Sequence, residues 1–102
     1  MKTLLLAATL TAISTWVMAA SVEEELAKSK SCLGCHAMNK KVMGPALLDL
    51  AKKYGSQPDA EAMLVQKVLT GSKGVWGSVA MPPNPISEAD ATTLVKWILG
   101  QK

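Results

Sequence analysis

Apolar positions recur at helical spacing in four stretches of the chain. One stretch follows Ser21, the second covers residues 47–54, the third runs from residue 57 to about residue 70, and the last follows Ser87. Spacings of three and four residues place such side chains on one face of a helix. No stretch alternates apolar and polar residues as a half-buried strand does. The pattern predicts an all-α chain with about four short helices.

Capping residues mark where the helices begin and end. Ser21 and Glu24 form a capping box, so a first helix should start there and reach the two cysteines at its end. Its partial apolar stripe consists of Val22, Leu26 and Leu33. Ser87 has the character of an N-cap for the last helix. Glycines stand at the predicted ends of the second, third and last helices: Gly55, Gly71 and Gly100. The predicted inner face of the last helix carries Ala91, Leu94, Val95 and Ile98, with Trp97 beside them.

Two segments between the helices lack periodicity. Residues 37–46 contain the breaker Gly44-Pro45, and residues 71–86 contain three glycines and three prolines. Both are predicted to be loops. An ordered loop as long as the second one usually serves a function.

The first twenty residues have the features of a secretory signal peptide. Lys2 supplies a positive start, an apolar run continues to about Val17, and the small residues Ala19 and Ala20 offer cleavage sites. The apolar run is interrupted by polar residues and is short for a membrane span. We therefore expect residues 1–20 to be cleaved, residues 21–102 to form one domain in the periplasm, and no stable membrane insertion. An uncleaved leader that serves as a membrane anchor is the alternative.

The charge of the exported domain is mild. Ten lysines and no arginines stand against eight acidic residues once Lys2 is removed. This balance does not indicate nucleic-acid binding. The compact, hydrated charge of lysine suits transient docking to a partner protein better than the two-pronged contacts that arginine makes. We also expect the protein to be a monomer.

The sequence Cys32-Leu33-Gly34-Cys35-His36 has the spacing of a c-type haem attachment site. Residues i and i+3 of a helix share a face, so both sulfurs can form thioethers with one edge of a porphyrin. His36 then lies beneath the iron as an axial ligand.

Other uses of a CxxC pair fit less well. A thioredoxin-type disulfide requires alternating strands and helices, and a zinc site requires a second pair of ligands. Copper(I) is a rival, because thiolates and methionines are soft ligands. The secretory leader and the absence of any other Cys or His favour covalently bound haem c.

Met81 is the predicted sixth ligand of the haem iron. Met is the usual partner of His in electron carriers, and Met81 lies in the long loop, far enough along the chain to reach the opposite face. Met38 and Met43 are too close to His36, and Met63 fits the apolar stripe of a helix.

These residues resemble a known family, the small bacterial class I cytochromes c of the c-551/c-552 type (cytochrome c8). The motifs are CLGCH at residues 32–36, MGPA at 43–46, GSKGVWGSVAMPPN at 71–84 and a final helix ending in LVKWILGQK. The GVWG stretch followed by MPPN is the most specific of them. The resemblance implies a small cytochrome c fold with about four short helices around one covalently attached haem.

The resemblance also implies roles for single residues. Cys32 and Cys35 match the thioether cysteines, and His36 and Met81 match the axial iron ligands. Pro45 matches a proline whose carbonyl accepts from the His ring nitrogen.

Three further matches concern the haem environment. Trp76 matches a tryptophan that donates to a haem propionate, and Asn84 matches an asparagine beside the Met sulfur. Lys67 stands where these proteins often have an arginine near a propionate, and it cannot make the planar two-pronged contact. Ala80 replaces a proline that commonly precedes the ligand Met.

The resulting interpretation is a single-electron carrier and not an enzyme, because an iron held by both His36 and Met81 cannot bind substrate. A haem protein with a labile Met81, acting as a peroxidase or gas binder, is the alternative, and a periplasmic copper-binding module is another. The resemblance suggests a cytochrome bc1-type complex as donor, and a terminal oxidase, nitrite reductase or cytochrome peroxidase as acceptor.

A domain of this size is marginally stable without a covalent staple, and a bound haem supplies large apolar faces to bury. We therefore expect protein prepared without haem to be largely unfolded. The measurement is an amide NMR spectrum of haem-free protein, in which well-dispersed signals would contradict this expectation.

Overall fold

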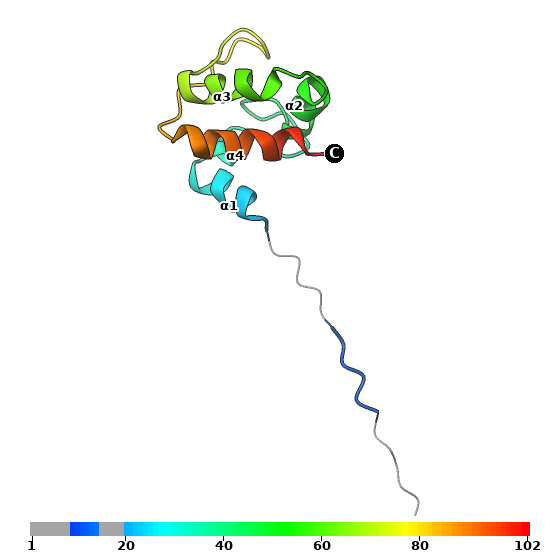
Figure 1. Ribbon diagram of the computed structural model, residues 1–102. Helices are drawn as coiled ribbons and strands as arrows, with labels where there is room; N and C mark the ends of the chain where they lie inside the picture. The colour runs from blue at the N-terminus through cyan, green and yellow to red at the C-terminus, as the bar shows by residue number, and fades with distance from the viewer. Residues whose placement is uncertain (1–8, 15–19) are drawn as a thin grey trace, which may run out of the picture.

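The computed structural model describes residues 9–14 and 20–102 and is helical (Figure 1). Within the described residues no strand forms. The elements in chain order are α1 (Val22–Ser29), the short 3₁₀ helix η1 (Cys32–Gly34), α2 (Leu47–Tyr54), α3 (Ala60–Thr70) and α4 (Glu88–Leu99). The predicted all-α class with about four short helices is confirmed.

The first helix ends earlier than predicted. Ser21 caps it, because its Oγ accepts from the backbone N–H of Glu24 at 3.1 Å. Helix α1 stops at Ser29, and Ser31 adopts a left-handed conformation with φ of 62°. The expectation that this helix carries the cysteines at its end is wrong, since this break separates α1 from η1. Val22 was expected on the apolar stripe and is 81% exposed; the buried residue of α1 is Ala27.

Helix α4 lies at the centre of the fold and packs against α1, α2 and α3 (Figure 1). Its N-cap is Ser87, whose Oγ accepts from the backbone N–H of Asp90 at 3.1 Å. Its buried side chains are Ala91, Leu94 and Val95, as the periodicity predicts, while Trp97 and Ile98 are half-buried.

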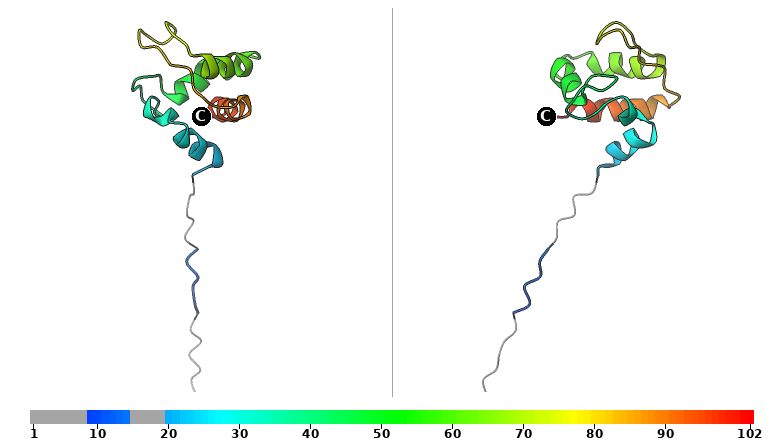
Figure 2. Two further views of the ribbon diagram at one scale, coloured as in Figure 1. Left: turned by 90° about the vertical axis from the view of Figure 1, so that its left-hand side faces the viewer. Right: turned by 180° about the vertical axis from the view of Figure 1, so that it is seen from behind.

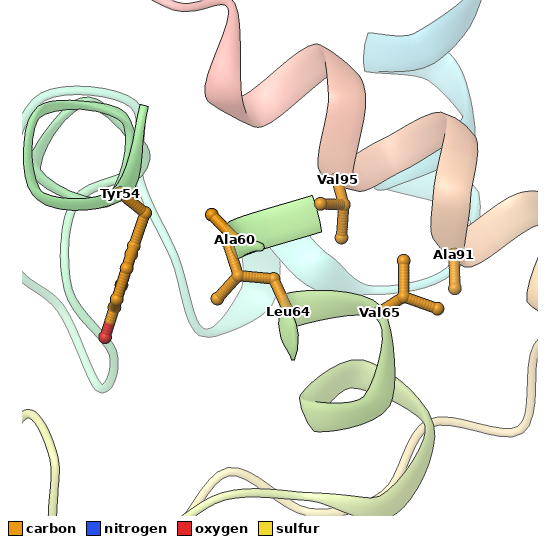
Figure 3. Packing of buried hydrophobic residues seen from close by; sticks show 6 residues of the cluster. All are labelled: Tyr54, Ala60, Leu64, Val65, Ala91 and Val95. Atoms are coloured by element: carbon orange, nitrogen blue, oxygen red, sulfur yellow. The ribbon is translucent and has the colours of Figure 1, made fainter. Parts of the chain in front are cut away.

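The main core cluster joins α4 to α3 and to the end of α2 (Figure 3). Its members are Tyr54, Ala60, Leu64, Val65, Ala91 and Val95. Apolar side chains that remain half-buried pack against the cluster: Leu50, Met63, Val68, Leu69, Trp76, Ile86 and Leu99. The structure therefore has a small buried core with a larger apolar margin around it.

The two predicted loops project from the same side of α3 and α4, as the left view of Figure 2 shows. Residues 37–46 follow His36, and residues 71–86 contain Met81. The fold thus places the segment after the CxxCH motif and the loop with the candidate sixth ligand on one side of the molecule.

The predicted signal peptide falls largely outside the described residues, because the structure does not describe residues 1–8 and 15–19. Among the helices that it does describe, none has the length and apolar character needed to cross a membrane.

Replacement of Leu94 by Ala should lower the free energy of unfolding of the haem-loaded protein by about 2–5 kcal/mol, because Leu94 is fully buried and its truncation leaves a cavity. The neighbouring exposed residue provides the control: Thr93→Ala should change stability by less than about 0.5 kcal/mol. Urea denaturation measures both, and equal effects of the two substitutions would contradict the packing assigned to α4.

Candidate haem site

The two cysteines lie at the start and just past the end of η1. In a 3₁₀ helix the side chains of residues i and i+3 eclipse one another, so Cys32 and Cys35 share one side of the turn. Cys32 holds the turn closed, since its carbonyl accepts from the N–H of Cys35 at 3.2 Å and of His36 at 3.0 Å. Both thiols are free and half-buried. The 3₁₀ turn therefore provides the shared face that was predicted from helical spacing.

The two thiols differ in environment. Burial raises the pKa of the Cys32 thiol above its ordinary value, and the nearby Cys35 acts in the same direction. Cys35 Sγ lies 3.7 Å from Met43 Sδ, a contact that the sequence did not predict.

The imidazole of His36 is fixed in one orientation. Its Nδ1 lies 2.8 Å from the carbonyl oxygen of Pro45. A carbonyl oxygen can only accept, so Nδ1 carries the proton and Nε2 carries the lone pair. A ring nitrogen held in this way leaves the other nitrogen free to bind a metal.

Gly44 packs directly against the ring of His36. A Cβ at this position would lie 2.5 Å from His36 Cε1 and 2.9 Å from Nδ1, closer than side-chain atoms approach. The N–H of Gly44 also donates to the carbonyl of Cys35 at 2.8 Å. Gly44 is a site residue that the sequence reasoning missed, because its position before Pro45 was interpreted only as a helix breaker.

The backbone of Met81 is held by paired hydrogen bonds. Its N–H donates to the carbonyl of Ser72 at 2.7 Å, and its carbonyl accepts from the N–H of Ser72 at 3.0 Å, which forms an isolated antiparallel bridge. Gly71 has φ of 88°, and a Cβ there would lie 2.8 Å from the Met81 oxygen, so this close approach requires glycine. The Met81 side chain is half-buried.

Asn84 and Lys67 contact the same loop. The Asn84 backbone N–H donates to the carbonyl of Val68 at 3.0 Å, and its side-chain Nδ2 donates to the carbonyls of Val68 at 3.3 Å and Pro82 at 3.2 Å. These contacts anchor the chain after Met81 to α3. Lys67 Nζ donates to Ser72 Oγ at 3.4 Å, which places Lys67 at the base of the loop.

Trp76 lies in the same loop, five residues before Met81, and is half-buried. Its ring meets the ring of Tyr54 edge to face, with centroids 6.4 Å apart and an interplanar angle of 67°. This contact joins the loop to the end of α2.

The chemistry of these residues fits a covalently bound haem. Two thiols on one side of a turn suit thioether formation, and the oriented imidazole and the thioether of Met81 are common axial donors. The half-buried apolar margin around the core, to which Met63, Val68 and Trp76 belong, offers the apolar surface that a porphyrin buries.

Comparison with known proteins decides the family. The sequence profile of the family described as "Cytochrome c" matches residues 24–102, which is most of the chain. This chain belongs to the cytochrome c family. Its cofactor is covalently attached haem c, and its fold is that of the class I cytochromes c.

Relatives of this cytochrome include cytochromes named c-551 and c-552. Cytochrome c-551 of Pseudomonas aeruginosa is 48% identical over 99 residues, which cover 97% of this chain and 92% of the relative. Cytochrome c-552 of Nitrosomonas europaea is 48% identical over 84 residues, 81% of this chain and 82% of the relative.

A solved structure supports the same assignment. The crystal structure of wild-type Nitrosomonas europaea cytochrome c552 superimposes with a TM-score of 0.75 at 49% identity, covering 78% of this chain and 99% of that one. The cytochrome described here is therefore a small monohaem electron carrier, which exchanges electrons with redox partners.

Replacement of Gly44 by Ala should displace the His36 ring and weaken its contact with Pro45, because the added Cβ cannot fit. We expect the haem-loaded cytochrome to lose about 1–3 kcal/mol of stability, as overpacked sites do. Chemical denaturation followed by haem absorbance measures this loss.

Gly34→Ala is the matched control, since a Cβ at Gly34 has no protein atom within 4 Å. If both alanine variants were as stable as the wild type, the close packing of Gly44 on His36 would be refuted.

Proposed function

We propose that this cytochrome is a periplasmic single-electron carrier with a six-coordinate haem, ligated by His36 and Met81, and that it is not an enzyme. The observation that carries the proposal is the 2.8 Å contact between His36 Nδ1 and the Pro45 carbonyl, which places the proton on Nδ1 and leaves the Nε2 lone pair available to bind iron.

Different residues of the CxxCH motif would bind different parts of the haem. Cys32 and Cys35 would form the thioether bonds, and His36 would bind the iron through Nε2. Pro45 keeps the imidazole in the tautomer whose Nε2 can bind metal. Gly44 leaves room for the ring, because a Cβ there would lie 2.5 Å from His36 Cε1. Haem c held in this way supplies one-electron exchange between the ferrous and ferric states.

Met81 is supported as the sixth ligand by the rigidity of its backbone. The bridge to Ser72 engages both the N–H and the carbonyl of Met81, so the backbone position from which its side chain extends is fixed. A thioether ligand favours the ferrous state and raises the reduction potential. If Met81 occupies the sixth coordination position, peroxide or gases cannot bind the iron. This supports an electron carrier over a peroxidase or gas binder.

Three residues of the loop region complete the proposed haem environment. Trp76 is proposed as a donor to a haem propionate, and Lys67 as a nearby positive charge in place of the more common arginine. Asn84 is proposed to act mainly by anchoring the segment after Met81, since its amide is engaged with the carbonyls of Val68 and Pro82.

Export to the periplasm rests on the first twenty residues. The signals are Lys2, the apolar run and the small residues at the cleavage site. The match to the Pseudomonas aeruginosa cytochrome spans 99 residues and therefore extends into this segment. We propose that cleavage leaves residues 21–102 as the functional cytochrome.

The proposed partners are larger redox proteins, with a bc1-type complex as donor and a terminal oxidase, nitrite reductase or cytochrome peroxidase as acceptor. Lys40 and Lys41 are exposed on the loop that follows His36. Positive charge at this position would steer an acidic partner toward the haem side of the cytochrome.

Replacement of Met81 by Leu should abolish the sulfur-to-ferric-iron charge-transfer band in the red region of the absorption spectrum and lower the reduction potential. Leucine has a similar volume and no donor atom, so the main change is the loss of the iron ligand. Absorption spectra of the oxidised protein and a redox titration measure the two effects.

Met43→Leu provides the control. Met43 is exposed and lies beside Cys35 on the other loop, so this variant should keep the red band. A wild-type spectrum without the band, or a Met81→Leu variant that retains it, would remove Met81 from the iron.

A further inference from the structure

Lys53 extends its ammonium group over two aromatic rings. Nζ lies 4.8 Å from the centroid of the Trp76 ring and 5.4 Å from the centroid of the Tyr54 ring. Both distances fall within the range of about 6 Å at which a cation is attracted to an aromatic face, and tryptophan offers the strongest such face. The two rings also contact each other edge to face.

These three side chains come from two separate parts of the chain. Lys53 and Tyr54 are the last two residues of α2, whereas Trp76 lies in the loop of residues 71–86. Tyr54 is buried in the core, so it provides a fixed wall for the indole. Lys53 is exposed and adds a second contact to the indole, over its face.

No carboxylate competes for Lys53 in the described part of the chain. The ion pairs found there join Lys28 to Glu24 and Glu25, and Lys96 to Glu61. The position of the Lys53 ammonium is therefore set by the aromatic rings.

We propose that Lys53 is a positioning residue for Trp76. Its ammonium holds the indole against Tyr54 and thereby fixes the direction of the indole N–H. This inference rests on the proposed function, in which that N–H donates to a haem propionate. Lys53 then influences the reduction potential through the orientation of Trp76, in addition to the influence of its own charge.

A variant of the adjacent Lys52 separates the effect of the Trp76 orientation on the reduction potential from the effect of the lysine charge. Lys52 is also exposed at the end of α2, and among the described residues its ammonium lies over no aromatic ring. Lys52→Gln removes one positive charge from the same helix end and leaves the contact with Trp76 intact. Lys53→Gln removes both the charge and the contact, and Lys53→Arg retains both.

The experiment measures hydrogen exchange of the indole N–H groups by NMR in the haem-loaded protein, together with the reduction potential of each variant. Trp97, on α4, is the internal reference for global opening. Lys53→Gln should speed exchange of the Trp76 N–H by about two- to fivefold, the factor that corresponds to ~0.5–1 kcal/mol for an exposed cation–π contact. Lys52→Gln should leave this exchange unchanged, and Lys53→Arg should restore it.

The potential should shift further in Lys53→Gln than in Lys52→Gln. Equal exchange rates in all variants, or equal shifts of the potential in both glutamine variants, would overturn the positioning role. A wild-type protein that lacks His/Met ligation would instead refute the proposed function, while the exchange rates would still test the contact between Lys53 and Trp76.

Discussion

The orientation of one imidazole is the constraint on which the site depends. For His36 to donate to the Pro45 carbonyl at 2.8 Å, residues 37–46 must fold back over the ring. Two further hydrogen bonds stabilise this folded-back segment. They run from Leu47 N–H to the Ala37 carbonyl and from Leu48 N–H to the Met38 carbonyl, both at 3.0 Å. Leu47 is fully buried at the start of α2. The His36 ring, whose Nε2 is the proposed iron ligand, is thus oriented by a loop that is itself anchored in the core.

The buried core is surrounded by an apolar margin. Among the residues that the structure describes, the largest fully buried side chains are only Leu47, Leu94 and Val95, which is little for a domain of this size. Bulky apolar residues such as Met63 and Trp76 instead remain half-buried around the cluster. A covalently attached porphyrin completes a core of this kind, so the cofactor acts as a structural element as well as a redox centre.

Local rules predicted much of the fold. The caps at Ser21 and Ser87, the buried face of α4 and the two loops follow from residue type and spacing alone. The end of α1 did not follow, because serine carries no strong signal for the left-handed conformation that Ser31 adopts. The CxxCH spacing predicted a shared face correctly, although a 3₁₀ turn and not an α-helix provides it.

Contacts between distant segments lay beyond sequence reasoning. Glycine is required at position 44 because the His36 ring lies against it, and Lys53 reaches Trp76 only because the long loop returns to the end of α2. The hydrogen bonds of the Asn84 side chain show the same limit, since residue type did not predict that its amide donates to the carbonyls of Val68 and Pro82. Residue type indicates which groups can interact, and the packing of the whole chain decides which of them meet.

The bridge between Ser72 and Met81 has an evolutionary consequence. It closes residues 73–80 into an excursion whose two ends are fixed to each other, and most of these residues are exposed. Substitutions or length changes at the tip of such an excursion need not move its base. The exposed residues of this excursion can therefore vary while the attachment point of Met81 stays constant.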